Sequence, residues 1–202
     1  MKKNSGTFIM GAVQTGGKMM GKVVREIWDW IKTFIIVFLI IIVIRAFFFA
    51  NYMVHGESMM PTIQHGERLI INKIGYYFGE PERFDLIVFH ANEDSDYIKR
   101  VIGLPGDHIE YRDDTLYING EAYEEEYLEE SIQQTINGNF TEDFTLEEVT
   151  NQSEVPPGTV FVLGDNRQNS MDSRQLGFID MDQIVGKASF RYWPISEMEM
   201  IQ

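Results

Sequence analysis

The feature that most constrains this chain is the segment 33–50, TFIIVFLIIIVIRAFFFA, in which Thr33 and Arg45 alone are polar. As a helix rising 1.5 Å per residue it would span about 27 Å, close to the roughly 30 Å hydrocarbon core of a bilayer. A segment that is apolar on all sides fits lipid better than a protein core, against which a helix needs only one apolar face. We therefore expect a transmembrane helix, with a buried core helix as the alternative.

Charge is distributed unevenly around this segment. Residues 1–32 contain six basic and two acidic side chains, whereas residues 33–202 contain 11 basic and 29 acidic ones. Because Lys and Arg favour the cytoplasmic side of a membrane, we expect 1–32 to be a cytoplasmic tail and 51–202 an extracytoplasmic domain. No small-residue cleavage motif follows the span, so we expect a single-pass protein of the cell membrane that keeps its anchor. The acidic domain should repel phosphate backbones, so nucleic acid is not an expected partner.

The remainder of the chain has the pattern of short strands separated by turns. Seven runs rich in β-branched and aromatic residues are bounded by Gly, Pro, Asp and Asn; they are RLIINKI, DLIVFH, YIKRVIGL, HIEYR, TLYING, TVFVLGD and KASFRYW. No strongly amphipathic stretch of helical length accompanies them. Residues 51–202 are therefore predicted to be mainly β, as an antiparallel barrel or sandwich. The acidic stretch 112–157 is predicted to be a small inserted subdomain, either simply solvated or a surface that selects substrate or binds a cation.

Cysteine and histidine exclude several kinds of site. The chain contains no cysteine, which excludes disulfides, thiolate metal ligands and a cysteine nucleophile. Its four histidines are scattered, without the paired spacing that places two ligands on one helix face. We therefore expect no metal and no cofactor.

A first candidate for chemistry is Ser58 in the segment YMVHGESMMPT. The ring of Pro61 biases the preceding residue toward extended backbone, and Gly56 permits a positive φ or the close approach of another chain. Ser58 thus carries a hydroxyl on a constrained turn just after the apolar segment. By itself, such a serine is more often a turn residue than a nucleophile.

A second candidate lies in DYIKRVIGLPGD, residues 96–107. Alternation along a strand places Lys99 on one face and Arg100 on the other, each among apolar residues, so we expect one of them to point inward. A lysine in an apolar site loses its preference for the charged form and becomes available as a general base, whereas an arginine stays charged. An exposed lysine is the alternative.

A third segment, VLGDNRQNSMDSR, follows a predicted strand with a dense set of charges and hydroxyls. Such a set suits a network of ion pairs and hydrogen bonds that orients other groups. An ordinary polar loop is the alternative. The relevant residues are Asp165, Arg167, Ser170, Asp172, Ser173 and Arg174.

Together the three segments resemble those of bacterial type I signal peptidases, the membrane-bound serine/lysine proteases that remove signal peptides from exported proteins. The N-terminal anchor, GESMMPT, GERLIINKI, YIKRVIGLPGD, GDNRQNSMDSR and IVGKASFRYWP carry the resemblance over nearly the whole chain. The single span, the short chain and Gly56, which stands where Gram-negative members have a serine donor, are similar to Gram-positive members.

The resemblance implies roles for individual residues. Ser58 would be the nucleophile and Lys99 its general base, with Arg100 facing away. Ser170 would hydrogen-bond and orient the lysine. Asp172 with Arg174 would form a supporting ion pair, and Asp165 and Arg167 would belong to the same network. The oxyanion hole would rest on backbone N–H groups, including that of Ser58.

The resemblance also implies an acyl-enzyme mechanism on secretory preproteins with Ala-x-Ala-like sites, next to the lipid bilayer and the protein export machinery. The substrate would add as a strand beside residues 52–58 or beside the strand that precedes Lys99. Met53, Gly56 and Met59 are candidate substrate-binding residues. Met53, Met59 and Trp193 are candidates for pocket or membrane-surface contacts, with plain packing as an equal alternative. Two alternatives remain: a catalytically silent relative that assembles surface proteins, and a Ser/His protease with His90 or His108 as its base.

Overall fold

The structure, a computed structural model, describes residues 10–201, and residues 1–9 of the predicted tail lie outside them. The chain divides at Phe47/Phe48 into two compact units, which we describe separately.

The first unit contains one helix, α1 (Met10–Phe48). Its 23 residues Lys22–Ile44 are long and apolar enough to cross a membrane, at about 34 Å of helix. Side chains throughout this stretch are exposed, as expected for a helix whose solvent is lipid and not for a core helix. The helix begins earlier than the predicted span and ends before Phe49, where the first strand starts.

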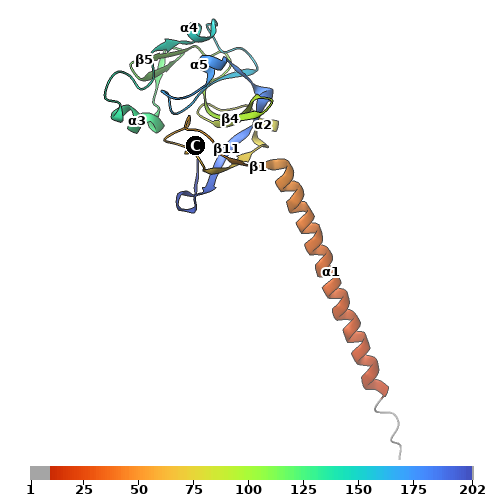
Figure 1. The fold of residues 1–202 in the computed structure, drawn as a ribbon. Helices are drawn as coiled ribbons and strands as arrows, with labels where there is room; N and C mark the ends of the chain where they lie inside the picture. The colour runs from red at the N-terminus through yellow and green to blue at the C-terminus, as the bar shows by residue number, and fades with distance from the viewer. Residues whose placement is uncertain (1–9, 202) are drawn as a thin grey trace, which may run out of the picture. The chain divides into compact units, whose positions relative to one another are not determined.

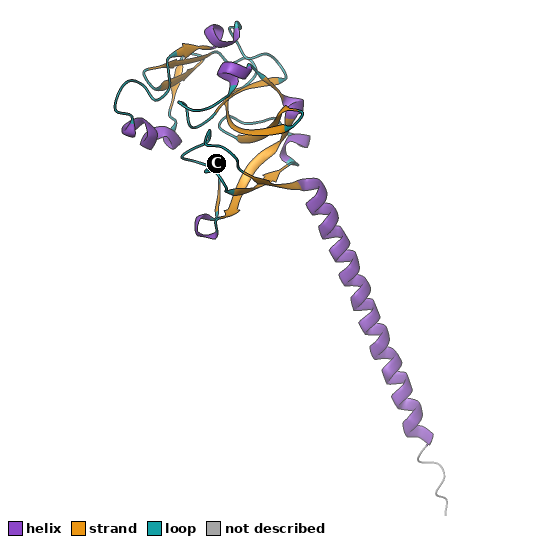
Figure 2. Ribbon diagram, viewed as in Figure 1, coloured by secondary structure: helices purple, strands orange, loops and turns teal. Residues whose placement is uncertain are grey.

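The second unit is built on two antiparallel sheets, which confirms the mainly β prediction (Figures 1 and 2). In the larger sheet the strand order is β1-β2-β11-β3-β4-β9-β10, with β12 also paired to β11. Its strands are β1 (Phe49–Met53), β2 (Arg68–Asn72), β3 (Leu86–Asn92), β4 (Ser95–Gly103), β9 (Thr159–Leu163), β10 (Ile179–Asp180), β11 (Ile184–Trp193) and β12 (Glu199–Met200). The short helices of this unit are α2 (Gly75–Phe78), α3 (Glu129–Gln134), α4 (Leu146–Thr150) and α5 (Ser173–Leu176).

The smaller sheet lies mostly within the acidic stretch of the chain, and its strand order is β7-β6-β5-β8. Its strands are β5 (Ile109–Arg112), β6 (Thr115–Ile118), β7 (Glu121–Tyr123) and β8 (Phe144–Thr145). The sheet thus opens with a strand that begins three residues before the predicted insertion 112–157. Figure 1 shows β5, α3 and α4 at the end of this unit that lies away from β1 and β11.

Strand β4 lies at the centre of the unit because both of its faces are covered. Ile102 packs in the cluster that joins the two sheets, and Ile98 packs against a second cluster with Leu69 and Val88. On the other face, Val101 and Tyr97 belong to a third cluster. A strand covered on both faces buries every side chain along its inner half, polar ones included.

Candidate active site

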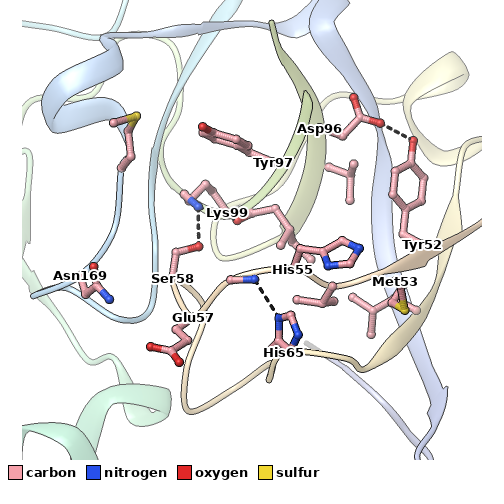
Figure 3. Close-up of a pocket in the computed structure, with 16 residues that line it drawn as sticks. Tyr52, Met53, His55, Glu57, Ser58, His65, Asp96, Tyr97, Lys99 and Asn169 are labelled. Carbon is pink, nitrogen blue, oxygen red and sulfur yellow. Dashed lines mark hydrogen bonds between the residues drawn. The ribbon is translucent and has the colours of Figure 1, made fainter. Parts of the chain in front are cut away.

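A groove of about 760 Å³ lies between two chain segments that are far apart in the sequence (Figure 3). One side is Tyr52–Ser58, the end of β1 and the turn after it; the other is Asp96–Lys99 of β4. Strand β1 is hydrogen-bonded to β2 alone among the described strands. Residues 96–99 pair with β3 on one side, and β4 pairs with β9 only from Arg100 onward. Both walls of the groove therefore present free strand edges.

Ser58 and Lys99 meet in this groove. Lys99 Nζ lies 2.7 Å from Ser58 Oγ and 3.1 Å from the carbonyl oxygen of Ile98. The lysine is only 3% exposed, and its burial lowers its pKa to about 8, although Asp172 and Asp165 act in the opposite direction. An amine with this pKa is partly neutral near pH 7 and can accept a proton from a neighbouring hydroxyl.

Arg100 is buried as well, on the opposite face of β4. Both cations therefore point inward, not one, because both faces of the strand are covered. Arg100 donates to both oxygens of Asp165, at 2.9 and 2.7 Å, and its guanidinium lies 3.8 Å from the ring centroid of Tyr127. A buried carboxylate neutralises the arginine, whereas Lys99 has only neutral atoms within hydrogen-bonding distance.

The loop after β9 supports the turn that carries Ser58. Asn166 donates its backbone N–H to the Ser58 carbonyl at 3.0 Å and its side-chain amide to the Glu57 carbonyl at 3.1 Å. A side chain on Gly164 would overlap the Ser58 carbonyl oxygen and Ser170, at 2.5 Å and less, so only glycine permits this approach. The sequence prediction missed Asn166, although it lies inside the GDNR motif.

The acidic and basic residues of this loop form two further ion pairs besides that of Asp165 with Arg100. Asp172 pairs with Arg174 at 2.9 Å, and it also accepts the backbone N–H of Gly164 at 3.0 Å. Arg167 pairs with Glu125, which lies in the acidic stretch and which the sequence prediction did not single out among many acids. Ser173, buried at the start of α5, accepts the backbone N–H of Val162.

Ser170 is placed differently from what the resemblance implied. Its Oγ is buried and has no hydrogen-bond partner among the residues that the structure describes. The expected hydrogen bond to Lys99 is absent, because the lysine is directed to Ser58 and the Ile98 carbonyl. The Ser170 hydroxyl packs instead against Gly164.

The candidate substrate-binding residues separate into two groups. Met53 is half exposed and lines the groove, as does Gly56, whose φ is +94°. Met59, the residue after the serine, does not line the groove. Its side chain is 1% exposed and packs in the apolar cluster with Ile63 and Leu69. Trp193 is also absent from the lining and lies half exposed beside Arg68.

The histidines proposed as alternative bases lie elsewhere. His90 pairs with Asp96, and His108 contacts the Ser153 carbonyl; neither lines the groove. Two histidines that the sequence analysis weighed only as metal ligands, and not as bases, His55 and His65, do line it. The backbone N–H of Gly56 donates to Nδ1 of His65 at 3.2 Å, so this imidazole serves the backbone of the turn.

Comparison with known proteins agrees with this geometry. Residues 27–193 match the family described as signal peptidase, peptidase S26. Signal peptidase I of Bacillus caldolyticus is 52% identical over 170 residues, which cover 84% of this chain and 91% of that protein. Signal peptidase IB of Staphylococcus aureus strain COL is 44% identical over 179 residues, or 87% of this chain and 94% of that one.

A solved structure supports the same assignment. The crystal structure of a signal peptidase I from Enterococcus faecalis V583 is 47% identical, with a TM-score of 0.52; the match covers 55% of this chain and 98% of that one. The resemblance seen in the sequence motifs is thereby confirmed. This chain belongs to the signal peptidase family, peptidase S26, and is an enzyme of that family.

Proposed function

We propose that this peptidase removes signal peptides from secreted preproteins with Ser58 as nucleophile and Lys99 as general base. The observation that carries the proposal is the 2.7 Å contact between Lys99 Nζ and Ser58 Oγ, made by a lysine that is 3% exposed. Burial keeps part of the amine neutral, and the short distance lets it accept the hydroxyl proton.

The reaction then proceeds in two steps. Lys99 takes the proton of Ser58, whose oxygen attacks the carbonyl carbon of the scissile peptide bond. The C–N bond breaks, the lysine returns the proton to the leaving amine, and an ester to Ser58 remains. Lys99 then takes a proton from water, whose oxygen attacks the ester carbonyl carbon. The ester bond to Ser58 breaks, the lysine returns the proton to the serine oxygen, and the signal peptide leaves with a new C-terminal carboxylate.

Backbone groups of the Ser58 turn are suited to stabilise the oxyanion. None of the described residues accepts a hydrogen bond from the Ser58 N–H, so this donor is available to the substrate. The glycine at position 56 supplies no side-chain donor, while its own N–H is engaged by His65. The oxyanion hole therefore depends on main-chain N–H donors.

The groove suits an extended substrate. A strand laid between the free edges of β1 and β4 would hydrogen-bond to both. In such a strand the residues at −1 and −3 point to the same side, because side chains alternate. Apolar side chains line the groove near the serine, among them Val54, Leu69, Val88 and Ile98, and would accept small residues at both positions, as in Ala-x-Ala sites.

The apolar helix supports a membrane anchor. Lys22–Ile44 is long enough to span a bilayer, and the basic residues that precede and begin it favour a cytoplasmic N-terminus. The catalytic unit would then be extracytoplasmic, where preproteins emerge from the export machinery with their own apolar segments still in the membrane. Shared anchoring would raise the effective concentration of the cleavage site.

Cleavage of a purified preprotein by the full chain in detergent tests the two catalytic roles. Ser58→Ala and Lys99→Ala should each lower kcat/KM by roughly 1000-fold or more while the protein stays folded. The matched substitutions Ser189→Ala and Lys73→Ala, at residues outside the groove, should leave it unchanged. Mass spectrometry of the products should place the cut after the −1 alanine of the Ala-x-Ala site.

Two results would contradict the proposal. Retained cleavage in Lys99→Ala would show that another group is the base, as in the Ser/His alternative. An inactive unsubstituted protein, tested on several preproteins, would favour a catalytically silent relative.

A further inference from the structure

A buried ion pair links the acidic stretch of the chain to the loop beside the catalytic serine. Arg167 Nη2 lies 2.7 Å from Glu125 Oε1, and the two side chains are 0% and 4% exposed. Glu125 follows β7, whereas Arg167 lies in the loop after β9, 42 residues further along the chain. Burying two charges is costly unless they are paired and hydrogen-bonded, so this pair demands a well-defined environment.

Nearly every polar side-chain atom of Glu125 and Arg167 has a hydrogen-bond partner. The hydroxyl of Tyr111 lies 2.9 and 3.0 Å from the two oxygens of Glu125, and Arg167 Nη1 donates to the same hydroxyl at 2.7 Å. Tyr127 donates to Glu125 Oε1 at 2.5 Å, and its ring also covers the guanidinium of Arg100. This closed network fixes the position of the Arg167 side chain.

The guanidinium in turn holds the backbone of the loop. Arg167 Nε donates to the carbonyl of Gly164 at 3.0 Å, and the Arg167 carbonyl accepts from Arg174 Nη2 at 2.8 Å. Gly164 is the residue at which the loop lies against the Ser58 carbonyl and Ser170. A path of direct contacts therefore runs from Glu125 through Arg167 and Gly164 to the turn that carries the nucleophile.

We propose that Glu125 is a positioning residue for catalysis: its pairing with Arg167 holds the loop 164–170 against the Ser58 turn. The inference deepens the proposed function and rests on it, since it assumes that Ser58 reacts. It also gives part of the acidic stretch a role in catalysis. This role differs from both a merely solvated surface and a surface that selects substrate. Without the carboxylate, the arginine keeps its charge in a buried site and must move or admit water, and the loop moves with it.

The substitution Glu125→Gln tests this in the full-length enzyme, because it removes the charge at nearly constant volume. We expect kcat to fall about 10- to 100-fold, since small displacements of reacting groups have effects of this size. KM should stay within about twofold, because the residue does not line the substrate groove. Glu124→Gln and Glu126→Gln remove the same charge from exposed neighbours and should leave both constants unchanged.

A second comparison separates positioning from a purely structural role. Each variant is assayed well below its melting temperature, measured by circular dichroism, so that only folded enzyme is compared. If Glu125 acts through Arg167, the double substitution Glu125→Gln with Arg167→Met should have a kcat no lower than the poorer single variant. Independent effects, which multiply, would contradict the proposal.

A milder variant keeps the test decisive if Glu125→Gln fails to fold. Tyr127→Phe removes one hydrogen bond to Glu125 and retains the ring over Arg100, so a smaller loss of kcat, about 2- to 5-fold, is expected. The inference would be overturned if folded Glu125→Gln had the kcat of the wild type. If Glu125→Gln cannot be assayed, a wild-type kcat in folded Tyr127→Phe would overturn it instead. The proposed function has a separate failure, in which Ser58→Ala or Lys99→Ala remains active.

Discussion

Lys99 and Arg100 are adjacent on β4, yet the structure gives them opposite electrostatic surroundings. Arg100 is bound by both oxygens of Asp165, so its charge is neutralised in place. Lys99 faces a hydroxyl and a carbonyl oxygen, which solvate an ammonium ion less well than water does. The same strand thus holds one permanently charged residue and one that can lose its proton near neutral pH.

The first prediction at this scale concerns pH. With a pKa of about 8, roughly a tenth of Lys99 is neutral at pH 7 and half at pH 8. Because the neutral amine is the active form, kcat/KM should rise with pH and level off above about 8. A pH profile measured on a preprotein checks this. A profile that keeps rising to pH 10 would show that the lysine retains its ordinary pKa.

Burial of Lys99 also predicts a stability cost. Below pH 8, the approximate pKa of Lys99 in the folded protein, the lysine is charged in both the folded and the unfolded state, and the folded state carries the full cost of desolvating the ammonium. This cost decreases as the pH rises from about 8 to 10.5, the pKa of the unfolded state, because the buried amine then becomes neutral. Lys99→Met should therefore raise the free energy of unfolding at pH 7 by about 1–3 kcal/mol, less at pH 10. Urea unfolding followed by circular dichroism measures this. Arg112→Met, at an exposed cation, should leave it nearly unchanged at either pH.

At the scale of elements, the loop after β9 is held from both sides. Asn166 binds the Ser58 turn, and Arg167 is held by Glu125 from the acidic stretch. Gly164 lies at the contact, where the two backbones approach more closely than any side chain allows. The alignment of nucleophile and base therefore depends on a residue that carries no functional group.

Gly164→Ala should consequently abolish most activity. Its Cβ would lie 2.1 Å from Ser170 Oγ and 2.5 Å from the Ser58 carbonyl oxygen, so the serine turn or the loop must shift. We expect kcat to fall about 100-fold or more, with a loss of stability of about 1–3 kcal/mol from overpacking. Gly75→Ala is the matched control, because nothing lies within 4 Å of its added Cβ. Normal kcat in folded Gly164→Ala would contradict the assigned contact.

At the scale of the whole molecule, the proposed topology divides the charge across a membrane. The basic residues near the N-terminus would face the cytoplasm and the acidic catalytic unit the outside, as the positive-inside rule requires. The distribution of charge then determines orientation and has no part in substrate chemistry.

The absence of cysteine from the sequence makes this topology directly testable. Lys22→Cys places a thiol at the N-terminal end of the proposed span, and Glu80→Cys places one in the catalytic unit, both at exposed positions. A membrane-impermeant maleimide added to intact cells should label the second variant, and the first only after the cells are opened. Labelling of Lys22→Cys in intact cells would show the reverse orientation, and labelling of neither would place the catalytic unit in the cytoplasm.

Much of the architecture could be predicted from local sequence. The apolar segment specifies a helix that lipid can solvate, and the β-branched runs between Gly, Pro and Asn specify short antiparallel strands. The residue pattern alone left Ser58 and Lys99 as candidates with bland alternatives, and the family resemblance of the motifs around them implied their roles. These properties depend on residues close together in the chain.

What the sequence by itself determined is therefore the class of fold, the family and the chemical types at the candidate site. The family resemblance had already implied that Lys99 serves Ser58, and the structure brings the two together across 41 residues. Only the tertiary structure decided that Arg100 pairs with Asp165 across 65 residues and Glu125 with Arg167 across 42. These partners depend on strand order and on β4 being covered on both faces, which no local pattern encodes. Glu125 shows the reason most clearly, since burial alone distinguishes it from the exposed glutamates on either side.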